Sequence, residues 1–110
     1  MNIADLQTSA REAAELMKAL SSENRLLLLC QLADGEKTVG ELADGLGLRQ
    51  AAVSQQLALL RKDGLVGARR NGRSMHYSLT GAEARAVILL LHHLYCAPAQ
   101  QRAQADPPGA

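Results

Sequence analysis

Apolar residues recur at helical spacing along the first half of the chain. A stripe of alanines, leucines and Met17 follows the capping-box sequence Ser9-Ala-Arg-Glu12 and predicts a first helix, which Ile3 and Leu6 are able to extend backwards. A second helix is predicted from Ser21 or Ser22 to residue 32. Its residues 26–29 are consecutive leucines, so it should lie in the middle of the domain.

The next stretch has the pattern of two helices joined by a tight turn. A second capping box, Thr38-Val-Gly-Glu41, opens a short helix that ends at Leu46, and Gly47 provides the turn. The following helix is predicted over residues 49–62, with Val53, Leu57 and Leu60 facing inward. Glycine follows at position 64, as is common after a helix C-terminus.

Alternating residues then predict a β-hairpin and a last helix. Residues 65–70 and 74–79 are predicted strands, and Asn71-Gly72 between them is typical of a type I′ turn. A third capping box, Thr80-Gly-Ala-Glu83, opens a helix that runs to about Cys96.

The order helix, turn, helix, hairpin predicts a mainly α winged helix-turn-helix domain over residues 1–97. Residues 98–110 are rich in Ala, Gln and Pro and predict a disordered tail. Residues 86–91 make the last helix apolar on every side. One small domain cannot cover that much apolar surface. We therefore expect a homodimer through the first and last helices.

Composition agrees with one helical domain. Of 110 residues, 47% are hydrophobic, but 19 are Ala and 20 are Leu, with no Phe or Trp, which favours helices over a β-sandwich. No apolar run is long enough for a membrane span, and the N-terminus lacks a secretory pattern. Two cysteines without an export signal indicate a cytoplasmic protein in which no permanent disulfide is expected.

The charges are divided unevenly along the chain and point to a polyanion. Residues 1–48 hold four bases and eight acids, giving −4, whereas residues 49–78 hold six bases and one acid, giving +5. The helix over 49–62 carries no charge between Arg49 and Arg61 and presents amides, a hydroxyl and small side chains, which suit base edges in a DNA major groove. The candidate DNA-binding residues are Arg49, Gln50, Ala51, Ser54, Gln55, Arg61, Lys62, Arg69, Arg70 and Arg73.

Five segments carry a specific resemblance. They are Leu20-Ser-Ser-Glu-Asn-Arg-Leu26, Val39-Gly-Glu-Leu-Ala43, Gln50-Ala-Ala-Val-Ser-Gln-Gln-Leu57, Leu60-Arg-Lys-Asp-Gly-Leu-Val66, and Arg70-Asn-Gly-Arg73 with Tyr77-Ser-Leu79. Together they resemble the ArsR/SmtB family of dimeric bacterial repressors over residues 9–96. The resemblance implies the same winged fold, dimerisation through the first and last helices, and an imperfectly palindromic double-stranded DNA operator from which an inducer releases the protein.

The two cysteines resemble the sensing pair of one subgroup. Cys30 follows four leucines and Cys96 ends His-His-Leu-Tyr-Cys, positions similar to the thiol pair of BigR- and SqrR-like repressors. That resemblance implies a redox sensor that persulfides or polysulfides bridge. Cys30 as an ordinary core residue is the alternative. Cys96 is the expected first attacker, and His92 or His93 is either a neighbour that activates it or an ordinary histidine.

The sequence is less consistent with a zinc sensor, an enzyme or a dimerisation adaptor. The family's zinc pattern on the last helix is broken, which leaves Glu83, His93 and Cys96 as an alternative zinc site, and no metal or cofactor is expected. The sequence shows neither a nucleophile paired with a base nor a phosphate-binding loop, so it gives no sign of an enzyme. A dimerisation adaptor without DNA binding is an alternative, but it would not explain the uncharged face between bases.

Overall fold

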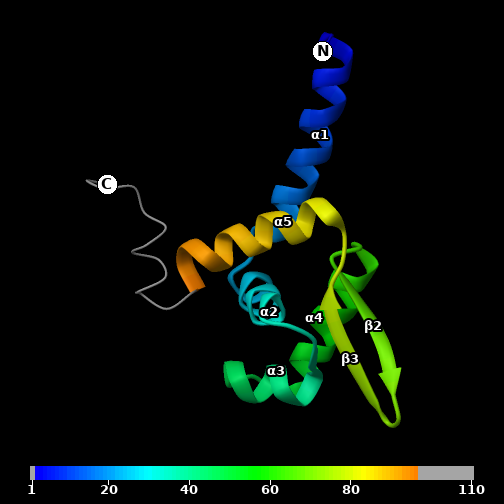
Figure 1. Ribbon diagram of the computed structural model, residues 1–110, viewed down its shortest axis with the longest axis vertical. Helices are drawn as coiled ribbons and strands as arrows, with labels where there is room; N and C mark the ends of the chain where they lie inside the picture. The colour runs from blue at the N-terminus through cyan, green and yellow to red at the C-terminus, as the bar shows by residue number, and fades with distance from the viewer. Residues whose placement is uncertain (1, 97–110) are drawn as a thin grey trace, which may run out of the picture.

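The computed structural model describes residues 2–96 and confirms the predicted winged helix-turn-helix (Figure 1). The elements, in chain order, are α1 (Ile3–Leu20), α2 (Glu23–Ala33), β1 (Lys37–Thr38), α3 (Val39–Leu46), α4 (Gln50–Lys62), β2 (Val66–Asn71), β3 (Ser74–Leu79), α5 (Ala82–Leu91) and a π-helical turn, η1 (His92–Cys96). The tail predicted for residues 98–110 lies outside the described residues. None of the helices within residues 2–96 is long and apolar enough to span a membrane.

Helix α2 lies at the centre of the domain, as its leucine run predicts. It contacts α3, α4, α5, β3 and η1. Leu28 and Leu29 are completely buried, whereas Leu27 keeps 41% of its surface exposed. The other fully enclosed core residues come from the surrounding helices and are Leu42, Val53, Leu57, Leu60 and Ile88. Burying each such side chain contributes about 1.5–3 kcal/mol to stability. Helix α2 is therefore the element around which α3, α4 and α5 pack.

The helix-turn-helix begins at a capping box that the sequence predicts correctly. The Thr38 hydroxyl accepts a hydrogen bond from the Glu41 backbone N–H, and the Glu41 carboxylate accepts one from the Thr38 N–H. The bond from the Thr38 N–H, together with the Thr38 hydroxyl, lowers the pKa of the Glu41 carboxylate from its usual value. Gly47 ends α3 in the left-handed conformation, with φ of 66°. This turn leads to the start of α4 at Gln50, three residues later.

The wing is a three-stranded antiparallel sheet in the order β1-β3-β2. The short β1, which the sequence pattern did not predict, pairs Lys37 and Thr38 with β3. The predicted turn is wrong by one residue, because Asn71 pairs with Ser74 and leaves Gly72 and Arg73 in the turn. Gly72 has φ of 65°, and no non-glycine residue of the described chain has positive φ. A type I′ turn needs two such residues, so the turn is not of the predicted type I′.

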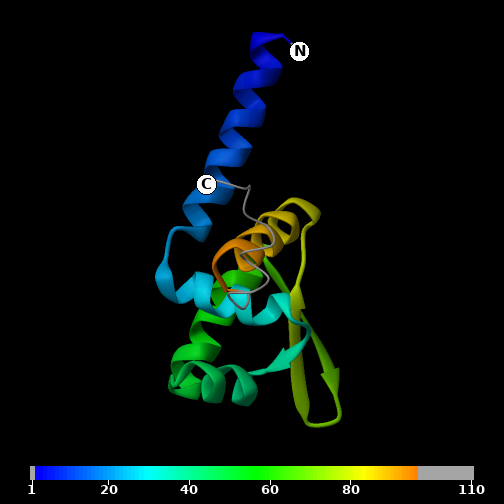
Figure 2. The same ribbon diagram turned by 60° about the vertical axis from the view of Figure 1, so that its left-hand side comes forward.

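Helix α1 begins earlier than its predicted capping box. The Asn2 side chain accepts a hydrogen bond from the Asp5 N–H and starts the helix there, which places Ser9 and Glu12 inside it. Only the last turns of α1 reach the core, where Leu16 and Ala19 pack and Leu20 is buried. Residues 2–15 are all exposed, and α1 projects from the body at the end opposite the wing (Figures 1 and 2).

Helix α5 also differs from its predicted ends. The third capping box is wrong because the Thr80 hydroxyl donates to the Gly64 carbonyl instead of capping the helix. Gly81, with φ of 81°, takes the N-cap position without a side-chain bond. Regular α-helix stops at Leu91 and continues to Cys96 as the wider η1 turn.

Candidate DNA interface and thiol elements

One side of α4 is built into the core and the other faces solvent. Val53, Leu57 and Leu60 are buried, as predicted from their spacing. The residues of the opposite side are all exposed and are Gln50, Ala51, Ser54, Gln55 and Ala58. This face can donate and accept hydrogen bonds without carrying charge, which suits contact with the edges of DNA bases.

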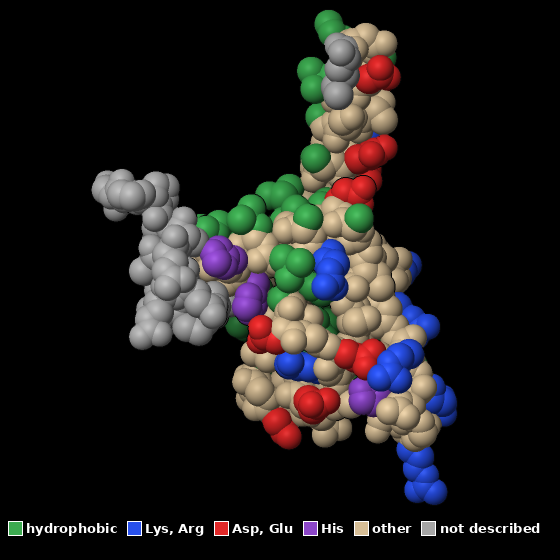
Figure 3. All heavy atoms as spheres, in the orientation of Figure 1, with side chains coloured by type: hydrophobic (Ala, Val, Ile, Leu, Met, Phe, Trp, Pro, Cys, Tyr) green, Lys and Arg blue, Asp and Glu red, His purple; other side chains and the backbone are tan. Residues whose placement is uncertain are grey.

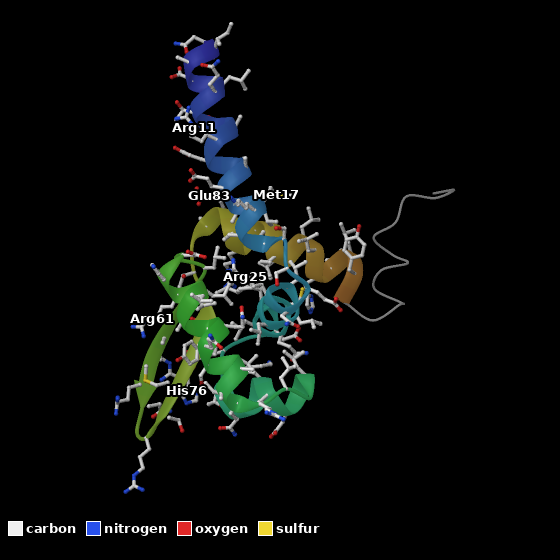
Figure 4. All side chains as sticks on the ribbon, turned by 180° about the vertical axis from the view of Figure 1, so that it is seen from behind. Arg11, Met17, Arg25, Arg61, His76 and Glu83 are labelled. Carbon is white, nitrogen blue, oxygen red and sulfur yellow. The ribbon has the colours of Figure 1, made fainter. Side chains whose placement is uncertain are left out.

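Basic side chains border this uncharged face. Arg49 lies at the N-cap of α4, and Arg61 and Lys62 lie in its last turn, all exposed. Arg61 points outward from α4 (Figure 4). Arg70 and Arg73 are exposed at the end of the hairpin, and Figure 3 shows Lys and Arg side chains along the hairpin side and its tip. The two groups of cations surround a surface suited to a duplex.

Arg69 differs from the other cations of the wing because it is already paired. Its Nε donates to both carboxylate oxygens of Glu36, at 3.0 and 2.8 Å, across 33 residues of sequence. The hydrogen bonds from Arg69 lower the pKa of Glu36, and the same bonds raise the pKa of Arg69. His76, the strand partner of Arg69, lies with Nδ1 3.8 Å from Glu36 Oε1.

The sequence did not reveal this cluster. An Asn71-Gly72 turn would have placed Ser74 opposite Arg69, and the true register puts His76 there. Only the corrected hairpin register together with β1 brings Glu36, Arg69 and His76 to one place. Arg69 therefore stabilises the base of the wing, and its charge is partly neutralised there.

Cys30 lies on α2 and is 8% exposed. It borders an apolar groove of about 380 Å³, which is also lined by Ser21, Ser22, Glu23, Leu26 and Leu27. Cys96 is the last residue of η1, and η1 packs against α2. The two cysteine-bearing elements are therefore neighbours within one chain.

The alternative zinc residues are far apart within one chain. Glu83 lies in the first turn of α5 and His93 follows its last turn, ten residues later. At 1.5 Å per residue, about 15 Å of helix separates them, which is too far for a shared ion. Among the side chains that the structure describes, which do not include that of Cys96, no group of three or more from His, Cys, Asp and Glu is arranged to hold a metal.

Comparison with known proteins gives consistent matches. The model of the family described as bacterial regulatory protein, arsR family, matches residues 22–67. The transcriptional activator HlyU of Vibrio cholerae is 46% identical over 87% of this chain and 89% of its own length. The structure of reduced HlyU from Vibrio cholerae superposes with a TM-score of 0.79 at 44% identity, over 86% of this chain and all of the other. The crystal structure of the transcriptional repressor BigR from Xylella fastidiosa has a TM-score of 0.81 at 39% identity, over 96% of this chain and 99% of the other.

Proposed function

Because this chain belongs to the arsR family of bacterial regulatory proteins and is a DNA-binding transcriptional regulator, we propose that it is a homodimeric repressor controlled by sulfur bridging of Cys30 and Cys96. The inducer in this proposal is a persulfide or polysulfide. Names of similar proteins agree with parts of it, since one is called a repressor and another was studied in a reduced form. The adaptor alternative is set aside because the matched family consists of regulatory proteins.

Exposed apolar side chains support the dimer. Ile3, Leu6 and Met17 of α1 keep 74%, 58% and 59% of their surface exposed, and Leu90 of α5 keeps 58%. Figure 3 shows hydrophobic side chains along one side of α1 and over α5, with acidic side chains on the other side of α1. A soluble monomer rarely leaves such a continuous apolar surface open to water. A second copy with the same surface would cover it around a two-fold axis.

The dimer would present two copies of α4 to one duplex. A two-fold axis places the recognition helices in successive major-groove segments, about 34 Å apart. The exposed face of α4 would read base edges through Gln50, Ala51, Ser54 and Gln55. The surrounding cations would bind phosphates, and these are Arg49, Arg61, Lys62, Arg70 and Arg73, with Arg69 contributing less because Glu36 holds it.

The observation that carries the switch is the position of α2. This helix contains Cys30 and contacts both helices of the α3–α4 unit, which we call the reading head. It also packs on α5 and η1. A covalent link from Cys30 to the end of η1 would therefore tie the reading head to a dimer helix. A small change in that geometry alters the distance between the two copies of α4. The two helices then no longer fit both halves of the DNA operator at once.

The chemistry balances with polysulfide as the oxidant. One cysteine thiolate attacks the terminal sulfur of HS₄⁻, which gives a persulfide, Cys–S–SH, and releases S₃²⁻. The second thiolate then attacks the inner sulfur of that persulfide, forms the S–S bond and expels HS⁻. The two thiols lose two electrons in total, and the polysulfide sulfur gains them as sulfide. A bridge that keeps additional sulfur atoms would differ by whole sulfur masses.

A DNA-release assay tests the proposal. Wild-type protein, reduced first, is bound to a duplex that it selects from a randomised pool, and sodium tetrasulfide is added. We expect affinity to fall by about 5- to 150-fold, the usual range of coupling between two sites. Cys30→Ser and Cys96→Ser should each bind the duplex as tightly as wild type and should resist release.

Mass spectrometry of the same samples identifies the bridge. The wild-type mass should show one intramolecular bridge, and dithiothreitol should reverse both the bridge and the release. If either serine variant is still released as wild type is, the thiol switch is wrong.

A further inference from the structure

A polar contact joins the two elements that carry the cysteines. His92 Nε2 lies 3.2 Å from Asp34 Oδ1. Asp34 is the C-cap of α2, four residues after Cys30, and His92 is the first residue of η1, four residues before Cys96. We propose that His92 and Asp34 are positioning residues that hold η1 against α2 and so bring the two thiols within reach of each other. This inference rests on the proposed function.

The contact lies where the chain changes from α-helix to π-helix. Residues 92–96 form a single π-helical turn, a form that is rare and usually confined to one turn. The α-helix ends at Leu91, and the His92 N–H still donates to the Ile88 and Leu89 carbonyls. The side-chain contact therefore adds a link to α2 at the residue where η1 begins.

His92 is also placed differently from its neighbour. Its side chain is 21% exposed and contacts Asp34 at the end of α2, whereas the side chain of His93, one residue later, is exposed. From the sequence alone, either histidine was a candidate neighbour of Cys96. The contact with α2 assigns the positioning role to His92 and makes His93 a matched control on the same turn.

Positioning affects only one of the two chemical steps. Attack of a thiolate on polysulfide involves a molecule from solution and does not need η1 to be held in place. Closing the bridge needs both sulfurs together, because a disulfide forms only when the two Cα atoms are about 4.4–6.8 Å apart. Holding the two groups in place speeds that second step, and losing the contact slows it.

The test measures the two steps separately in the full-length dimer at one fixed pH. Reduced protein is treated with sodium tetrasulfide, quenched by alkylation at set times, and analysed by mass spectrometry for open persulfide and for the bridge. In His92→Leu and Asp34→Leu we expect bridge closure about two- to fivefold slower, as suits a partly exposed polar contact, with the rate of first persulfide formation unchanged. His92→Gln, whose amide can still contact Asp34, should recover part of the rate, and His93→Leu should close as wild type does.

Two further results decide the interpretation. The double variant His92→Leu/Asp34→Leu should be no slower than the slower single variant, because both changes remove one contact. Reduced-state binding to the selected duplex is measured for each variant, and it should equal wild type if the domain is folded. Wild-type closure rates in both leucine variants, with Cys30→Ser and Cys96→Ser still blocking release, would overturn the positioning role alone. Loss of the cysteine requirement would instead overturn the proposed function.

Discussion

Single residues of the wing show how a charge gains its role from its neighbour. The sequence predicts the same DNA-binding role for Arg69, Arg70 and Arg73. Of the three, Arg69 alone has a bidentate partner, Glu36. That pair joins the segment before β1 to β2, with His76 of β3 beside it. Arg70 and Arg73 lie further towards the tip, where a duplex would be reached first. Arg69 therefore stabilises the base of the wing, whereas Arg70 and Arg73 are exposed and available for the proposed contact with DNA.

The Glu36–Arg69 pair predicts a pH-dependent stability. Since the pKa of Glu36 is lowered in the folded protein, its contribution is present above the ordinary pKa of 4.5 and is lost as the pH falls through the lowered value. Wild type should unfold at a slightly higher temperature than Glu36→Gln at pH 7, and this difference should shrink below about pH 4.5. Thermal unfolding across a pH series measures it.

Arg69→Gln provides the control for that series. It should remove the same pH-dependent difference, and Glu36→Gln/Arg69→Gln should add nothing further. A difference between wild type and Glu36→Gln that persists unchanged at low pH would contradict the assignment.

At the scale of elements, the α3–α4 unit is set by local signals that act within a few residues. The Thr38–Glu41 capping box starts α3, and Gly47 ends it in a conformation that residues with a Cβ rarely adopt. Gly45, by contrast, lies inside α3 with an ordinary backbone. A Cβ at Gly45 would meet Gln31 Oε1 at 3.6 Å, which is normal contact.

The two glycines therefore predict opposite effects of alanine. Gly47→Ala should destabilise the fold by about 1 kcal/mol, because φ of 66° strains an L-residue. Gly45→Ala should stabilise it by about 0.5–1 kcal/mol, because alanine favours helix. Urea unfolding of both variants at one protein concentration compares them directly. Equal effects of the two substitutions would mean that the left-handed turn does not govern this unit.

The whole molecule has two ends with different roles. The reading head and wing lie at one end, α1 projects at the other, and α2 and α5 lie between them (Figures 1 and 2). Arg25 supports the bend between α1 and α2, since it donates to the Ala19 carbonyl at 2.9 Å and lies 3.8 Å from Asp63 at the end of α4. Arg25 therefore links the end of α1 to the end of α4.

Placing a charge on the apolar surface of α1 or α5 should separate the two subunits of the proposed dimer. Leu6→Glu on α1 and Leu90→Glu on α5 would place a carboxylate where the dimer is proposed to exclude water. We expect a monomer at micromolar concentration by analytical ultracentrifugation, and DNA affinity lower by about tenfold or more. Glu15→Gln, an exposed polar position on the same α1, should leave the mass of the dimer unchanged. Dimeric Leu6→Glu and Leu90→Glu proteins would contradict the proposed interface.

The sequence by itself determined the features whose information is local. Helical periodicity, the Thr38 capping box and the Gly47 turn depend on residues within one or two turns, so α2, α3, α4 and the exposed face of α4 were predicted correctly. The start of α1 and the cap of α5 differ from the prediction because Asn2 caps α1 seven residues before Ser9, and the Thr80 hydroxyl donates to the Gly64 carbonyl.

Only the tertiary structure decided which distant residues meet. The hairpin register set His76 opposite Arg69, the β1 pairing placed Glu36 beside them, and packing of η1 on α2 brought His92 to Asp34. These contacts join residues at least seven positions apart, so no local pattern encodes them. They depend on the sum of burial and strand pairing over the whole domain, which exists only once the chain has folded.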